Sequence, residues 1–161
     1  MITVERLLFL QNVALFGKMK TRELGHIAAI AEEVVFTAGE PIFAKGDYGD
    51  SMYLIVEGQV RIHRGGVRLN VLDEKAYFGE MALLDGEPRS ASATAQTDCL
   101  LLRIGQEEFL HFLSGNFAAA LTILRTITQR LRDVMEAHDR QVIEADKRSQ
   151  EAEASNARTA S

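Results

Sequence analysis

Glycine and proline punctuate the middle of this sequence and limit the folds open to it. Nine of the twelve glycines and both prolines fall between Gly39 and Gly105. Gly and Pro favour turns and interrupt regular elements. The apolar runs between them are short, and the run over 60–63 alternates apolar with polar residues, as a half-buried strand does. We therefore expect an antiparallel β sandwich or barrel, with strands over 34–36, 41–43, 52–56, 60–63, 67–72, 89–95 and 99–104.

Helices are predicted on both sides of this β region. Residues 3–32 read as helical, with a break at 15–17 and with Thr21 as the N-cap of the second helix. After the last predicted strand, a short helix is expected over 106–113 and a break at Gly115. The fold class we predict is therefore mainly β with flanking helices.

The last part of the chain predicts one long helix. From Phe117 onward there is neither glycine nor proline. Such a helix, with one apolar stripe, can lie over the mouth of a barrel, pair with a copy of itself, or do both. We place a domain boundary after residue 137, with 138–161 as a charged helical extension whose tail frays or is disordered from about Gln150. The residues of the stripe repeat at alternating intervals of four and three: Phe117, Leu121, Leu124, Thr128, Leu131 and Met135.

Composition excludes several classes of protein. The net charge of −5 argues against a nucleic-acid surface, which needs clustered Lys and Arg. No stretch approaches the roughly 18 continuous apolar residues of a membrane span. The apolar run Leu7–Leu10 is too short for the core of a signal peptide, so we expect a cytoplasmic protein without membrane contact. The single cysteine, Cys99, lies in an apolar run and is expected to be buried and inert.

The stretch 77–95 combines features of a small anion site. Gly79 allows a sharp turn and a close approach of the backbone to a ligand. Glu80–Leu84 can form one short helical turn, whose first N–H groups and dipole favour a phosphate. Arg89 adds a fork of donors that matches phosphate oxygens. Glu80 repels phosphate but accepts hydrogen bonds from a sugar hydroxyl, and a site that takes both groups predicts a nucleotide.

These residues resemble a known family. The segments 78–84 (FGEMALL) and 88–92 (PRSAS) are similar to the phosphate-binding cassette of the cyclic nucleotide-binding domain family. That family includes protein kinase A regulatory subunits, the catabolite activator protein and cyclic nucleotide-gated channels. The resemblance covers roughly residues 5–137. It implies a β jelly-roll barrel with N-terminal helices and a long C-terminal helix, a cyclic nucleotide as ligand, and no other cofactor.

The resemblance also implies roles for single residues. Gly79 and Glu80 would hold the ribose 2′-hydroxyl. The side chain of Arg89, with the backbone of Ala82 and Ser90, would hold the cyclic phosphate. A threonine after the arginine often accompanies cGMP binding. Ser90 stands there instead and leaves the base preference open, and we favour cAMP over cGMP. Two further groups follow: Ile62 and Leu69 would line the purine end, with plain barrel core an equal alternative, and Leu131, Val134 and Met135 are lid candidates on the last helix.

Alternatives remain for the site and for the chain. Glu80 and Arg89 could form a salt bridge that only staples a turn. The domain could also be a dimerisation module that binds no nucleotide. About 26 residues follow Met135, too few for a helix-turn-helix domain, so no nucleic-acid binding is expected of this chain by itself. We expect no enzyme and no metal site, because no nucleophile–base pair stands out and the histidines are scattered: His26, His63, His111 and His138.

Overall fold

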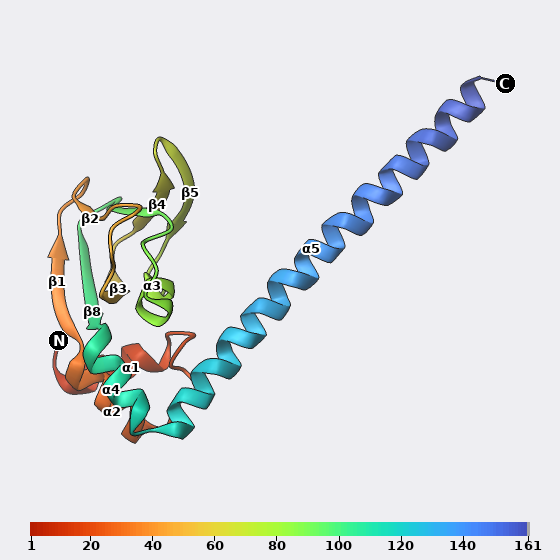
Figure 1. The fold of residues 1–161 in the computed structure, drawn as a ribbon. Coiled ribbons are helices and arrows are strands. Elements are labelled where there is room, and N and C mark those ends of the chain that lie inside the picture. The colour runs from red at the N-terminus through yellow and green to blue at the C-terminus, as the bar shows by residue number, and fades with distance from the viewer. Residues whose placement is uncertain (161) are drawn as a thin grey trace. The chain divides into compact units, whose positions relative to one another are not determined.

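Two four-stranded antiparallel sheets form the centre of the computed structural model, which describes residues 1–160 (Figure 1). Three helices lie together at the β1 and β8 end of the sandwich, and one very short helix follows the strand β6. The elements in chain order are α1 (Thr3–Gln11), α2 (Thr21–Ile30), β1 (Glu32–Phe36), β2 (Pro41–Phe43), β3 (Ser51–Glu57), β4 (Val60–Arg64), β5 (Val67–Leu72), β6 (Tyr77–Phe78), α3 (Glu80–Asp85), β7 (Ser92–Ala95), β8 (Cys99–Gly105), α4 (Gln106–Ser114) and α5 (Phe117–Thr159).

The strand order confirms the predicted fold class, mainly β with flanking helices. The prediction of a closed barrel is wrong. The first sheet runs β1-β8-β3-β6 and the second runs β2-β7-β4-β5. All pairings between these strands are antiparallel. Across residues 1–160 the edge strands of one sheet do not pair with those of the other, so the barrel is not closed. The fold is a sandwich of two facing sheets.

The first core lies between the two sheets. Tyr53 and Ile55 of β3 face it, as alternate residues of one strand must. Cys99 is buried there, as expected. The other alternate residues of β3 and β8 are also fully buried, so this sheet is covered on both faces: Met52, Leu54, Leu102 and Ile104.

The helices form a second core beside this sheet. Helix α1 packs on α2, and α4 packs on α2 and β8. The rings of Phe16 and Phe109 meet edge to face, with 6.4 Å between centroids. Arg6 of α1 donates hydrogen bonds to the carbonyl oxygens of Ala28 (3.1 Å) and Ala31 (2.8 Å) at the C-terminus of α2. A cation at that end of a helix complements its dipole.

Several predicted boundaries differ from the structure. The N-cap of α2 is Lys20, and Thr21 is the first helical residue. Strand β7 begins at Ser92, three residues later than predicted, because the backbone of Arg89 is bonded to the 46–47 turn and not to a neighbouring strand. The two-residue strand β6 was not predicted, since it is too short to show alternation.

The remainder of the chain, from Leu124 to the end of the described residues, forms a second compact unit. Apart from Ala160, it consists of the part of α5 from Leu124 to Thr159. The fraying or disorder that we expected from about Gln150 is therefore wrong for residues 150–159, which are helical. The boundary after residue 137 stays a prediction. Within residues 1–160, no helix combines the length and the apolar character that crossing a membrane requires.

Candidate functional site

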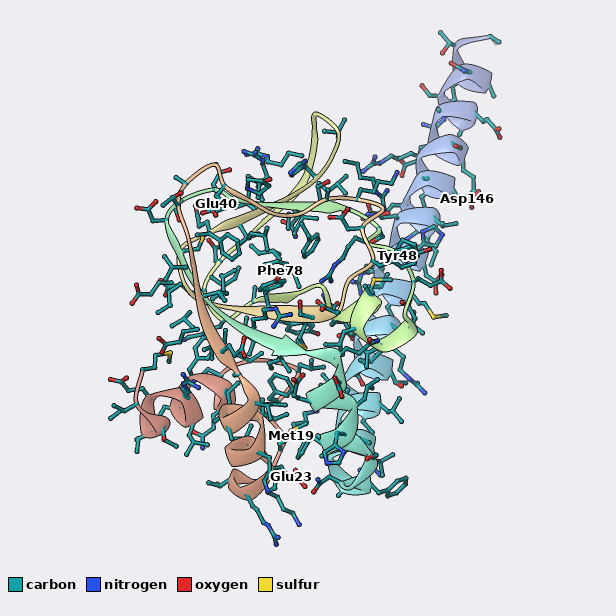
Figure 2. The ribbon with its side chains drawn as sticks, turned by 60° about the vertical axis from the view of Figure 1, so that its left-hand side comes forward. Met19, Glu23, Glu40, Tyr48, Phe78 and Asp146 are labelled. Atoms are coloured by element: carbon teal, nitrogen blue, oxygen red, sulfur yellow. The ribbon has the colours of Figure 1, made fainter. Side chains whose placement is uncertain are left out.

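Arg89 is fixed by its own backbone in a turn between α3 and β7. Its N–H donates to the carbonyl oxygen of Asp47 at 2.7 Å, and its carbonyl oxygen accepts from the N–H of Gly46 at 2.9 Å. The adjacent Pro88 forms an isolated β bridge with Tyr48. The cassette turn is thus clamped to the loop between β2 and β3, which is more than 40 positions away in the sequence. Figure 2 shows Phe78 in the interior of the sandwich and Tyr48 on this loop.

The Arg89 guanidinium is buried against neutral groups. The residue is 5% exposed. Its Nη1 donates to the carbonyl oxygen of Gly79 at 2.9 Å, and its Nη2 donates to that of Ser51 at 2.6 Å. Its Cζ lies 4.1 Å from the centroid of the Phe43 ring, a cation–π contact. Its Nε is buried and has no hydrogen-bond partner within the described residues.

Two glycines leave the space that the guanidinium fills. A Cβ atom on Gly49 would lie within 2.2–2.7 Å of three guanidinium atoms of Arg89. A Cβ on Gly79 would lie 2.6 Å from Nη1, and Gly79 has a φ of +81°, which other residues rarely adopt. The position of the side chain therefore depends on both glycines.

Burial leaves the charge of Arg89 weakly compensated. Burial lowers the pKa of the guanidinium, because removal from water disfavours the charged form. The phenol of Tyr53 and the carboxylates of Asp50, Asp47 and Glu80 act in the opposite direction through space. The two hydrogen bonds nevertheless go to carbonyl oxygens and not to Glu80, so the geometry does not support a Glu80–Arg89 staple. The site can accept an anion that brings its own oxygen atoms.

The cassette helix α3 begins where we expected. Gly79 is its N-cap, Glu80 is its first residue, and the helix runs one residue beyond the predicted end. Ala82 is buried and Glu80 is half-buried. Ser90, which follows Arg89, is exposed, and its carbonyl oxygen accepts a hydrogen bond of 3.1 Å from Nε of Arg64 in β4.

Three residues that shape the site were missed from the sequence. Ser51 supplies a carbonyl acceptor, Phe43 supplies the ring under the guanidinium, and Gly49 supplies the space. Gly49 was predicted only as a turn glycine, and Phe43 only as part of a strand. The repeated Gly-Asp spacing over 46–50 is the one signal in the sequence that marks this loop.

The predicted purine and lid residues have different surroundings. Ile62 is partly buried and packs against the core between the sheets. Leu69 is 48% exposed, so the plain-core alternative is wrong for it. The lid candidates Leu131, Val134 and Met135 are exposed on α5, in the second unit of the chain. Their role as a lid stays a prediction.

The histidines do not form a metal centre. Within residues 1–160, no group of three or more His, Cys, Asp or Glu residues is arranged to hold a metal ion. His26 is exposed, and its ring lies 5.7 Å from that of Phe112. His63 alternates with the inward-facing Ile62, but it is hydrogen-bonded and not a free surface residue: its ring contacts the hydroxyl of Thr94 and the carbonyl oxygen of Gly65.

Comparison with known proteins supplies an independent finding. Residues 33–116 match the model of the family described as the cyclic nucleotide-binding domain. The cAMP-dependent protein kinase regulatory subunit of Aspergillus niger is 38% identical over 107 residues, which are 65% of this chain and 26% of that protein. The chain thus spans about a quarter of the length of the kinase regulatory subunits it matches.

Solved structures share the fold. The N-terminal domain of a transcriptional regulator from Streptomyces coelicolor A3(2) superposes with a TM-score of 0.72 at 30% identity, over 80% of this chain and 94% of that one. The catabolite activator protein of Thermus thermophilus gives a TM-score of 0.68 at 31% identity, over 78% and 62% of the two chains.

Proposed function

Because the chain belongs to the cyclic nucleotide-binding domain family, we propose that it binds a cyclic nucleotide as a regulatory signal and carries out no chemistry on it. The observation that carries this proposal is the buried guanidinium of Arg89, whose hydrogen bonds reach only carbonyl oxygens. A buried cation without an adjacent anion costs free energy. The cyclic phosphate would supply that anion through charge-assisted hydrogen bonds.

Glu80 would bind the sugar. It is the first residue of α3 and is near enough to raise the pKa of Arg89 through its charge. In this proposal Gly79 and Glu80 hold the ribose 2′-hydroxyl, and the backbone of Ala82 and Ser90 completes the phosphate site. The two ends of the ligand are then recognised by residues that the cassette turn brings together.

The base would lie toward β4 and β5. Ile62 and Leu69 supply apolar surface there, and the exposure of Leu69 leaves it available to a ligand. We propose cAMP rather than cGMP, because two relatives of this chain, from Aspergillus niger and Emericella nidulans, are named as cAMP-dependent protein kinase regulatory subunits.

The signal would pass to α5. Closure of Leu131, Val134 or Met135 over the base would shift the population of this helix. Moving such a switch from mostly open to mostly closed needs a difference in affinity of about 5 kcal/mol between the two states.

Calorimetric titration of the whole chain against cAMP, cGMP and other cyclic nucleotides tests the proposal. We expect saturable one-to-one binding with cAMP as the tightest ligand. A ligand at 100 times its Kd should stabilise the fold by about 2.7 kcal/mol in a parallel thermal melt. Absence of both heat and a melting shift at millimolar concentrations of every ligand would refute it.

The ribose contact has its own test. Glu80→Ala and a 2′-deoxy cyclic nucleotide each remove one side of the same hydrogen bond. Combined, they should therefore cost no more binding free energy than either change separately. Additive losses would mean that Glu80 acts elsewhere.

A second candidate function is dimerisation through α5. The observation that favours it is a row of exposed apolar side chains that continues the predicted stripe along the helix: Leu124, Leu131, Met135 and Val142. A helix with this spacing can bury the row against a second copy of itself. The two functions are compatible.

A further inference from the structure

A small hollow lies on the outer face of the second sheet, at the hairpin between β4 and β5. Its volume is about 300 Å³. It lies outside the core, because Arg61 and His63 alternate along β4 with the inward-facing Val60 and Ile62. The residues that line it are Arg61, His63, Gly65, Gly66, Arg68 and Gln96.

The charges around this hollow are all positive or neutral. No Asp or Glu is among the residues that line it. Arg61 donates from Nη1 to the side-chain oxygen of Gln96 at 3.2 Å, a neutral acceptor. Among the ion pairs of residues 1–160, none includes Arg61 or Arg68.

The strand register brings these side chains together. His63 of β4 lies directly opposite Arg68 of β5, with Arg61 two residues along β4. The two arginines are diagonal neighbours across these strands, so two like charges share one hollow and repel each other. The chain as a whole carries a net charge of −5, so this uncompensated positive cluster does not follow from its composition.

His63 holds the walls of the hollow in place. One ring nitrogen lies 2.8 Å from the hydroxyl of Thr94 in β7, and the other lies 3.1 Å from the carbonyl oxygen of Gly65 at the hairpin tip. Both ring nitrogens are therefore occupied. The groups left for a ligand are the guanidinium of Arg68 and the free donors of Arg61.

We propose that this hollow binds a phosphate-type oxyanion, separately from the cassette. Two guanidinium groups present forked donors that match the oxygens of a phosphate. The volume lies at the lower end of the roughly 300–1,000 Å³ usual for small-molecule pockets, which fits a compact anionic group. The bound anion would offset the repulsion between the two guanidinium groups.

Residue-resolved NMR of the whole chain tests this site. Inorganic phosphate is titrated at constant ionic strength, with sodium chloride as the compensating salt. We expect saturable shifts of the Gly65 and Gly66 amides. The double variant Arg61→Gln/Arg68→Gln should weaken this binding about tenfold or more, because the charge-assisted hydrogen bonds of both guanidinium groups are lost.

Arg22→Gln, which removes an exposed arginine from α2, is the matched control and should leave the phosphate response unchanged. The amide of Gly79 reports phosphate that enters the cassette, so the two sites are read separately in one experiment. The test does not depend on the proposed cyclic nucleotide.

A second arm distinguishes a free phosphate from a lipid headgroup. Vesicles of phosphatidylcholine with phosphatidic acid are sedimented with the wild-type chain and with the double variant. Arginine-dependent binding to vesicles, without a response to inorganic phosphate, assigns the anion to a headgroup. Arginine-dependent binding of inorganic phosphate assigns it to a free anion. If neither probe binds, or if the double variant binds as well as the wild type, the site does not exist.

Discussion

The charge of Arg89 lies in an almost fully buried position, and its hydrogen-bond acceptors are neutral. Continuum reasoning and mutagenesis agree that such a buried charge is retained at a cost unless a partner compensates it. The Phe43 ring and two carbonyl oxygens provide partial compensation. The guanidinium is therefore held in position before a ligand arrives, and less side-chain entropy is lost on binding.

Arg89→Lys should separate the contribution of the positive charge to ligand binding from that of the forked guanidinium geometry. Lysine keeps the positive charge but loses the fork that reaches Gly79 and Ser51 together. We expect cyclic nucleotide affinity to fall roughly tenfold to a hundredfold, about 1.5–3 kcal/mol. Calorimetry of the variant measures the loss, and the melting temperature without ligand is the control for folding. Unchanged affinity would show that the fork does not contact the phosphate.

Gly49→Ala should displace the side chain of Arg89 by steric overlap. The added Cβ would overlap the guanidinium of Arg89 at 2.2 Å. We expect a loss of about 1–3 kcal/mol in stability, as for other overpacked sites, together with loss of nucleotide binding. Denaturant melts and calorimetry measure the two effects.

Gly25→Ala is the control for this substitution. Gly25 lies inside α2, and a Cβ there meets nothing within 4 Å. This variant should gain about 0.5–1 kcal/mol, because alanine favours helix, and should bind nucleotide normally. Equal behaviour of the two variants would contradict the steric argument.

At the scale of elements, strand β4 stabilises the cassette through a side-chain hydrogen bond. Nε of Arg64 donates to the carbonyl oxygen of Ser90, directly after Arg89. On the other side, the N–H of Lys45 donates to the hydroxyl of Ser92 at the start of β7. The segment from Arg89 to Ser92 is thus bonded to β4 as well as to the loop between β2 and β3.

Arg64→Gln should remove this hydrogen bond between β4 and the cassette. The variant loses one hydrogen bond from an exposed side chain, so we expect affinity to fall a few-fold, about 1 kcal/mol. Arg68→Gln, in the same hairpin but without a bond to the cassette, should leave nucleotide affinity unchanged. Titration calorimetry compares the two, and equal losses would point to a general electrostatic effect and not to the Ser90 contact.

Most helices and strands could be predicted from the sequence, but some strand boundaries and the contacts between distant segments could not. Turn glycines and apolar alternation located seven of the strands, because both signals are local. Strand β6 and the late start of β7 could not be predicted, since they depend on pairing with distant segments. The same holds for the site: the cassette motif identified Arg89, but Ser51, Phe43 and Gly49 became visible only through contacts made in three dimensions.

At the scale of the whole molecule, the chain consists of two units with different kinds of stability. Residues 1–123 have two packed cores. The second unit is helical, and its side chains are mostly exposed. Exposed side chains contribute little packing, and most helix stability in proteins comes from burial of an apolar face.

Leu131→Glu should therefore test whether α5 pairs with a copy of itself. If the row Leu124, Leu131, Met135 and Val142 forms a dimer seam, a charge at its centre should shift the chain to monomer, because an unpaired buried charge is costly. Light scattering coupled to size exclusion measures the mass. Ala137→Glu adds the same charge off the seam and should leave the mass unchanged. Identical masses for the wild type and both variants would rule out this seam.

The missing side chain of Gly49 has a consequence for other proteins built on this plan. A domain could keep both sheets, all its turns and even its arginine, but an alanine at this position would fill the space that the guanidinium needs. Such a protein would have the fold of a nucleotide receptor without a working phosphate site. The residue at the position of Gly49 would be enough to recognise it.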